Sequence, residues 1–193
     1  MQFSLFGAEA AEPTLDDLAG VLLAGGQWVR SGDRARLSIV VADAWRADAL
    51  VMEFAARGVA ADSGDGTAPT PGGIVARTAF SDSLHAIARP WRRGANDSPP
   101  DDFTLTAGGL RLWTLAAGRR DEAGYLLATA QPEDAVHRAA GAQLSRFGLA
   151  AVSLTRRGGG PGWRISSQRR LRRLAELVGE APPGAGADWP ATG

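Results

Sequence analysis

The chain has 193 residues, a formal net charge of zero and no cysteine, and 45% of its residues are hydrophobic. This length and composition suit one compact domain or two fused repeats with a sizeable core, and they exclude a disordered chain. The missing cysteines exclude disulfides and thiolate metal sites, and the zero net charge argues against a strong non-specific binder of nucleic acids.

The first half of the chain predicts a helix, a hairpin, a helix, a hairpin and a helix, in that order. Residues 1–13 are expected to form a flexible arm. Thr14 and Asp17 have the spacing of a capping box, and leucines at helical spacing follow until Gly25 and Gly26 end the helix. The remaining elements are strands at 27–30 and 35–42, a helix at 44–57, strands at 59–63 and 73–80, and a helix at 81–91.

A linker and a second copy of this order follow. The predicted domains are a repeat at 14–91, a linker at 92–103, a repeat at 104–179 and a flexible tail at 180–193. Little chain lies between Gly118 and Tyr125, so we expect the second copy to lack a full first hairpin. Its predicted elements are a helix at 110–118, a strand at 124–130, a helix at 133–147, strands at 151–156 and 163–167, and a helix at 169–178.

Residues 18–26 read Leu-Ala-Gly-Val-Leu-Leu-Ala-Gly-Gly, which resembles the LAGLIDADG signature of homing endonucleases. Leu23 stands at the first acid of that motif, and Gly25 stands at the metal-binding catalytic acid. A second copy at residues 116–124 keeps the first acid as Asp121 and has Ala123 in place of the catalytic one. Nuclease chemistry in this family needs a carboxylate from each motif to hold a divalent metal, so the resemblance implies a scaffold that has lost this chemistry.

The resemblance covers residues 14–179 and implies an α/β (α+β) fold of two pseudo-symmetric αββαββ repeats with saddle-like antiparallel sheets. In that family two motif helices pack closely at a pseudo-twofold axis, which here would be helices 15–25 and 109–118. Ordinary packing of small residues at helix ends remains the alternative. The small residues expected at the contact are Ala19, Gly20 and Ala24 on one helix and Ala116, Ala117 and Gly118 on the other.

Arginines on or beside the predicted strands are the candidate DNA contacts. Leu37, Ile39 and Val41 share one face of their strand, which leaves Arg36 on the other face. In the family the open face of the saddle lies on DNA, and arginine can bind phosphate bidentately or reach guanine edges. The alternative is that these side chains only solubilise an exposed face. The candidates are Arg30, Arg36 and Arg77 in the first repeat and Arg156, Arg157 and Arg164 in the second.

The start of the chain resembles the short peptide by which bacterial proteins dock on the DNA sliding clamp, usually written Gln-Leu-Ser/Asp-Leu-Phe. The matching residues are Gln2, Phe3, Ser4, Leu5 and Phe6, with Phe3 in place of the usual leucine. Leu5 and Phe6 would fill an apolar pocket, and Gln2 would bind at its rim. The alternative is an N-terminal strand that packs on the core.

Other patterns that could carry chemistry are weak. His85 and His137 lie far apart, and no cluster has metal-ligand spacing. Asp82, Ser83 and His85 are adjacent on one predicted helix, so they cannot converge as a triad. The glycine-rich residues 158–162 lack the Lys-Ser/Thr pair of a phosphate-binding loop. We therefore expect no catalytic residue, no metal and no cofactor.

The sequence favours a non-catalytic protein that binds DNA or a DNA-processing assembly, with the sliding clamp as a second partner. One alternative is a protein-interaction module with no role in nucleic-acid binding, and another is a metal nuclease that uses Asp121 or Glu122. No apolar run approaches the roughly 20 residues that span a bilayer and no signal peptide begins the chain, so we expect a cytoplasmic protein.

Overall fold

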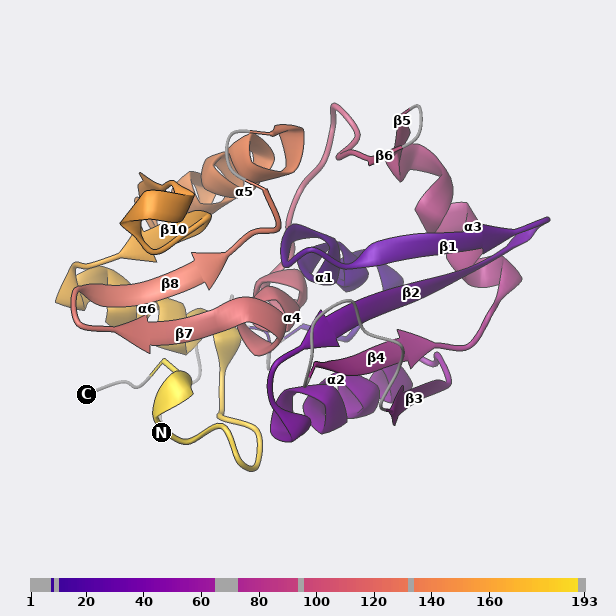
Figure 1. Ribbon diagram of the computed structural model, residues 1–193, viewed down its shortest axis with the longest axis horizontal. Helices are drawn as coiled ribbons and strands as arrows, with labels where there is room; N and C mark the ends of the chain where they lie inside the picture. The colour runs from indigo at the N-terminus through magenta and orange to yellow at the C-terminus, as the bar shows by residue number, and fades with distance from the viewer. Residues whose placement is uncertain (1–7, 9–10, 65–72, 94–95, 132–133, 191–193) are drawn as a thin grey trace.

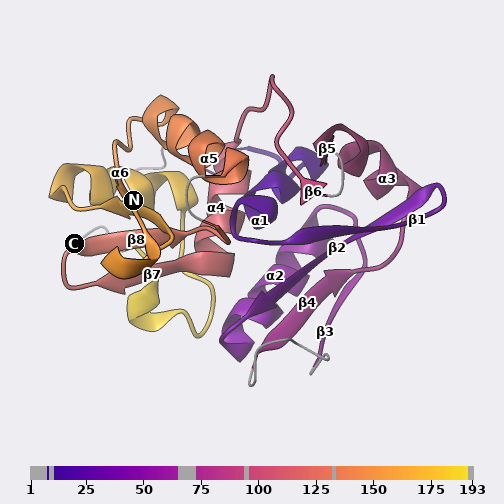
Figure 2. The same ribbon diagram turned by 45° about the horizontal axis from the view of Figure 1, so that its top comes forward.

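The computed structural model describes residues 8, 11–64, 73–93, 96–131 and 134–190. The chain has an α+β fold with two four-stranded antiparallel sheets, as the sequence predicts. Figures 1 and 2 both show the sheets on either side of a central pair of helices, α1 and α4. The strand order is β1-β2-β4-β3 in the first sheet and β7-β8-β10-β9 in the second, so the two sheets have the same topology.

The first half follows the predicted order of elements closely. Thr14 begins it as a helix N-cap, and its backbone N–H donates to the Asp17 carboxylate over 3.1 Å, as the predicted capping box requires. The elements are the 3-10 helix η1 (Leu15–Leu18), α1 (Ala19–Leu23), β1 (Gln27–Ser31), β2 (Arg34–Val41), α2 (Ala44–Ala56), β3 (Ala61–Gly64), β4 (Ile74–Thr78), α3 (Asp82–Ala88) and the 3-10 helix η2 (Arg89–Trp91).

The predicted linker begins with a small hairpin that touches the first sheet. Its strands are β5 (Arg92–Arg93) and β6 (Asn96–Asp97). The Asp97 carboxylate accepts a hydrogen bond from the backbone N–H of Trp28 over 2.9 Å and pairs with Arg30 over 2.7 Å. The segment therefore holds β1 as well as joining the halves.

The second half contains a first hairpin, so the prediction that this hairpin is incomplete is wrong. Helix α4 passes at Gly118 directly into a strand, and a two-residue turn suffices to start the next one, so the short segment has enough residues. The elements are α4 (Ala107–Ala117), β7 (Gly118–Asp121), β8 (Gly124–Ala128), α5 (Ala135–Arg146), β9 (Val152–Leu154), the 3-10 helix η3 (Arg156–Gly158), β10 (Gly162–Ile165), α6 (Gln168–Val178) and the 3-10 helix η4 (Gly186–Asp188).

The helices α1 and α4 touch through glycines. A Cβ atom placed on Gly20 would overlap the backbone carbonyl of Gly109, so the helix backbones lie in direct contact there. The contact between the two helices is as predicted, but Gly109 lies near the start of α4, not among the expected small residues at its end. The reason is that α4 begins at Ala107, earlier than the sequence predicts, which brings Gly108 and Gly109 to the crossing.

The first sheet has one face that is covered by helices and one face that bears no helix. In β2 the side chains of Leu37, Ile39 and Val41 are buried on the helix-covered face, as predicted. Val40 points the other way and is 39% exposed, and Val29 on β1 is 37% exposed on the same side. We call this helix-free side the open face of the first sheet.

The segment after α6 is packed on the molecule, and the prediction of a loose tail is wrong for residues 180–190. Trp189 is buried, and its indole N–H donates to the Gly179 carbonyl over 2.9 Å. Its ring also lies 5.2 Å from the Arg111 guanidinium. A segment rich in proline and glycine can still dock when it carries one large aromatic anchor.

The single tyrosine of the chain, Tyr125, gives a pH-dependent prediction. Burial raises the pKa of its hydroxyl above the ordinary value of about 10. The unfolded chain therefore loses this proton at a lower pH than the folded protein does. The contribution of Tyr125 to the free energy of unfolding is full below about pH 10 and is lost as the pH rises above that value. Ultraviolet titration should show no tyrosinate near pH 10 in the folded protein, whereas the guanidinium-unfolded chain titrates there. Equal titration of both states would contradict the burial.

Candidate nucleic-acid interface

Two of the six candidate arginines, Arg36 and Arg77, lie on the open face of the first sheet. Arg77 lies opposite Ser38 in the ladder and pairs with Asp62 over 2.8 Å. The Arg36 guanidinium lies 4.8 Å from the centre of the Phe80 ring. Both partners of the Arg77 ion pair are largely exposed, so this pair contributes about 1 kcal/mol or less and can open for another anion.

Arg34 belongs to the same face but is not among the six candidates. It lies opposite Ser31, two residues before Arg36, and its guanidinium donates to the Phe80 carbonyl over 2.5 Å. Residues two apart on a strand share a face, so the spacing of Arg34 and Arg36 is the signal that could have identified it.

Arg30 lies on the helix-covered face, not on the open one. In the ladder it pairs with the fully buried Ala35. Its guanidinium donates to the Ala88 carbonyl over 2.9 Å and to Asp97 over 2.7 Å. These contacts tie α3 and the small β5–β6 hairpin to the first sheet.

The equivalent face of the second sheet is covered by the segment between β9 and β10. Leu126 points to this face, opposite Arg119 and Arg164, yet it is fully buried. The Arg119 guanidinium donates to the Gly159 carbonyl over 2.8 Å, which holds the covering segment in place. Arg164 pairs there with Asp121 over 2.6 Å.

The remaining two candidates lie in the covering segment itself. Arg156 donates to the side-chain oxygen of Gln131 over 2.9 Å, and Arg157 is exposed. The structure therefore brings Arg34, Arg36 and Arg77 together and places the candidates of the second half apart from them.

The positions that the resemblance assigns to the catalytic acids differ in the structure from those predicted. Gly25 follows α1 with a positive φ of 102°, which a glycine adopts readily. Residues 116–124, however, form the end of α4 and the β7–β8 hairpin, so they do not match the first signature in structure. When the two halves are aligned at their N-cap residues, Thr14 and Thr106, residues 18–26 correspond to residues 110–118. Neither segment carries a carboxylate.

No group of three or more metal-ligating side chains is placed to hold a metal within the described residues. His137 is buried on α5, with its ring nitrogens 2.9 Å from the Thr129 hydroxyl and 2.8 Å from the Ser153 hydroxyl, and it stacks on Trp163. In this setting the imidazole joins α5 to the second sheet. Ser83 bonds to Ser81 over 2.7 Å, away from any triad arrangement.

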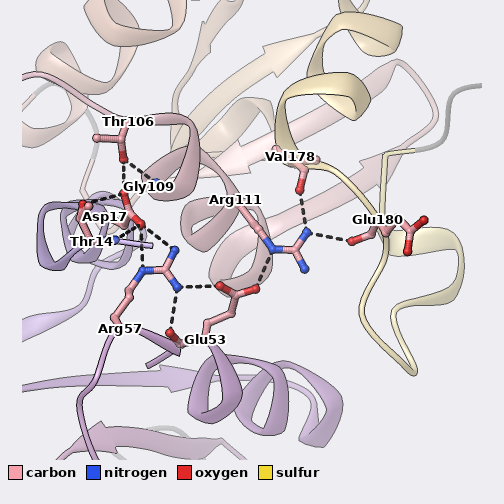
Figure 3. A network of polar contacts seen from close by, with 9 residues as sticks. All are labelled: Thr14, Asp17, Glu53, Arg57, Thr106, Gly109, Arg111, Val178 and Glu180. Atoms are coloured by element: carbon pink, nitrogen blue, oxygen red, sulfur yellow. Dashed lines mark hydrogen bonds and ion pairs between the residues drawn. The ribbon is translucent and has the colours of Figure 1, made fainter. Parts of the chain in front are cut away.

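A buried network of charges crosses between the halves, and Figure 3 shows it. Arg57 pairs with Asp17 over 2.8 Å and with Glu53 over 2.7 Å, and Glu53 also pairs with Arg111 on α4 over 2.6 Å. The Thr106 hydroxyl donates to Asp17 over 2.6 Å. Because Asp17 and Arg57 are almost fully buried and have several partners each, the network joins helices and is closed to a ligand.

Arg111 extends this network to the end of α6. Its guanidinium donates to the backbone carbonyls of Val178 and Glu180 over 2.6 and 2.8 Å. Charges from three segments that are distant in sequence meet here, together with backbone carbonyls at the end of α6. No local pattern in the sequence predicts such a meeting.

The predicted clamp-docking residues Gln2, Phe3, Ser4, Leu5 and Phe6 lie outside the described residues. Ala8, which is described, donates its backbone N–H to the Leu177 carbonyl over 2.7 Å. The chain therefore passes the C-terminal end of α6 just after the motif.

Comparison of the sequence with protein-family models and with curated proteins finds no match. Among the described helices, none has the length and apolar character that crossing a membrane requires.

Proposed function

We propose that the protein binds DNA without cutting it, with the open face of the first sheet as the main contact. The observation that carries this proposal is the repeated topology. Two sheets of identical strand order lie on either side of a glycine-mediated helix contact, as the resemblance to the LAGLIDADG family implies. The absence of a carboxylate at Gly25 and at Ala117, its structural counterpart, supports binding without cleavage.

The chemistry of the open face suits a phosphate backbone. Arg34, Arg36 and Arg77 present guanidinium groups that can bind phosphates bidentately. Val29 and Val40 are exposed beside them and offer apolar contacts of the kind that thymine methyl groups make. On a protein whose net charge is zero, a surface of this kind favours binding of polyanions at this face over non-specific binding across the whole protein.

Replacing Arg34, Arg36 and Arg77 with alanine should weaken the binding of duplex DNA. We expect the slope of log K against log salt to fall by about three, roughly one for each lost phosphate contact. Fluorescence anisotropy of a labelled duplex between about 50 and 200 mM salt measures both quantities. The matched control replaces Arg89, Arg120 and Arg138, which are exposed elsewhere, and removes the same charge.

No binding by the wild-type protein at about 50 mM salt would refute the proposal, because electrostatic contacts are strong there. Equal loss in the open-face variant and the control would show a general charge effect only. The same reactions with magnesium or manganese test the absence of cleavage. Reproducible cutting that Asp121→Ala abolishes would assign an enzyme instead.

Docking on the sliding clamp is a second candidate, supported by the match of residues 2–6 to the docking peptide. Replacing Leu5 and Phe6 with alanine should abolish clamp binding, since burying each such side chain contributes about 1.5–3 kcal/mol. The melting temperature should stay nearly unchanged. Unfolding of this variant would show that residues 2–6 belong to the core, and no wild-type binding at tens of micromolar clamp would make the motif a coincidence.

A further inference from the structure

A dense group of arginines with few acidic partners lies on α6, away from every candidate that the strands offer. This helix buries Leu171, Leu174 and Leu177 against the core. Its outer side carries arginines at four of five successive positions, which are Arg169, Arg170, Arg172 and Arg173.

These charges differ in their partners from two of the candidate arginines on the strands. Arg77 and Arg164 each pair with an aspartate on their own sheet. Among the described residues no carboxylate pairs with Arg169, Arg170 or Arg172, and Arg173 reaches Glu176 only at 3.7 Å. The guanidinium groups of α6 are therefore free to bind an external anion without first breaking a close ion pair.

The four arginines line a groove of about 530 Å³ between the N-terminal half of α6 and the end of α5. Phe147, Gly148 and Ser167 also line it, as does one acidic residue, Glu176. The first turn of α6 contains no acidic residue, and Ser167 does not cap the helix with its side chain. The positive end of the helix dipole therefore adds to the arginine charges at the same place.

We propose that this arginine groove holds the phosphodiester backbone of a nucleic-acid strand. The inference rests on the proposed function, which supplies nucleic acid as the class of partner. It adds a second surface of the protein that contacts this partner. Several adjacent guanidinium groups along a groove match the repeated phosphates of a strand better than one isolated anion. Among the described residues, the large apolar side chains that are exposed are Val29, Val40, Met52 and Val152. All four lie outside the groove, which favours a nucleic-acid strand over a lipid surface as its partner.

The groove and the open face lie on different sides of the molecule. In Figure 1, α6 passes behind β7 and β8, on the helix-covered side of the second sheet. The two surfaces can therefore be tested separately by substitution.

The experiment compares four full-length proteins by fluorescence anisotropy with a labelled duplex and a labelled single strand. They are the wild type, R169A/R170A/R172A, the open-face variant R34A/R36A/R77A and the control R89A/R120A/R138A. We expect the groove variant to bind at least one of the two substrates about tenfold more weakly or worse, with a salt slope lower by roughly three for duplex. Its melting temperature should equal that of the wild type, because the replaced side chains are exposed.

The outcomes separate the two proposals. Unchanged affinity of the groove variant, with weakened binding by the open-face variant, would overturn the groove and leave the proposed function standing. The reverse result would support the groove and move the DNA contact away from the open face. No binding by the wild type would overturn both.

A competition measurement tests whether the groove binds a nucleic-acid strand or a single phosphate group. Inorganic phosphate is added at an ionic strength matched with sodium chloride. We expect phosphate to displace the strand no better than chloride does. Displacement at a few millimolar phosphate would overturn the assignment to a strand, because it would show a site for one phosphate group.

Discussion

Replacing Gly20 with leucine is expected to lower the free energy of unfolding by about 3 kcal/mol, the upper end of the usual cost of overpacking. At this position the carbonyl oxygen of Gly109 already occupies the space that a Cβ would need. The neighbouring atoms are backbone, which cannot rotate away, so α1 and α4 must separate to admit a side chain. Even Gly20→Ala should destabilise the protein for the same reason.

Chemical denaturation measures this effect, and Gly64→Ala is the matched control. Gly64 has no atom within 4 Å of the position where its Cβ would lie, so the change should leave stability within about 0.5 kcal/mol. Equal stability of the Gly20→Leu variant and the wild type would mean that the helices do not meet at this glycine.

Replacing Arg57 with methionine is expected to cost about 3–5 kcal/mol, because it leaves the buried carboxylate of Asp17 without its ionic partner. Asp17 would keep the Thr106 hydroxyl and the Thr14 backbone N–H, and neither carries a positive charge. Glu53 would lose one of its two arginines and keep Arg111. Urea denaturation followed by circular dichroism gives the free energy.

Arg77→Met is the control for this prediction, since it removes the same charge from an exposed pair. Its cost should stay within about 1 kcal/mol. The double variant Asp17→Leu with Arg57→Met should recover much of the loss, because an apolar pair leaves no buried charge. A cost for Arg57→Met no larger than that of the control would show that the network adds little to stability.

The sequence predicts those elements whose side chains alternate or recur clearly. Buried Leu37, Ile39 and Val41 define β2, and the glycines after α1 mark its end. Strand β7 was missed because Gly-Arg-Arg-Asp has no apolar residue to reveal an inward face. The packing of residues 180–190 was not predicted, because a high content of proline and glycine is typical of a flexible tail and Trp189 is the one large apolar residue there.

The candidate interface was predicted in part. Alternation along β2 and β4 correctly separates Arg36 and Arg77 from the buried residues. The same rule, applied to β1, would have placed Arg30 beside the buried Trp28 and so off the open face. The covering of Arg164 could not be predicted, because it depends on where a glycine-rich segment folds in three dimensions.

The buried ion pair of Asp17 and Arg57 has no counterpart in the second half. Gly109 stands third after its N-cap threonine, as Asp17 does, and Phe147 ends α5 as Arg57 ends α2. Consider a symmetric pair made of two copies of the first half. It would bring two aspartates to the helix crossing, where Asp17 now meets a glycine. Two copies of the second half would bring none and would lose the ionic link. The halves are therefore not interchangeable, and each has become specific for the other as its partner.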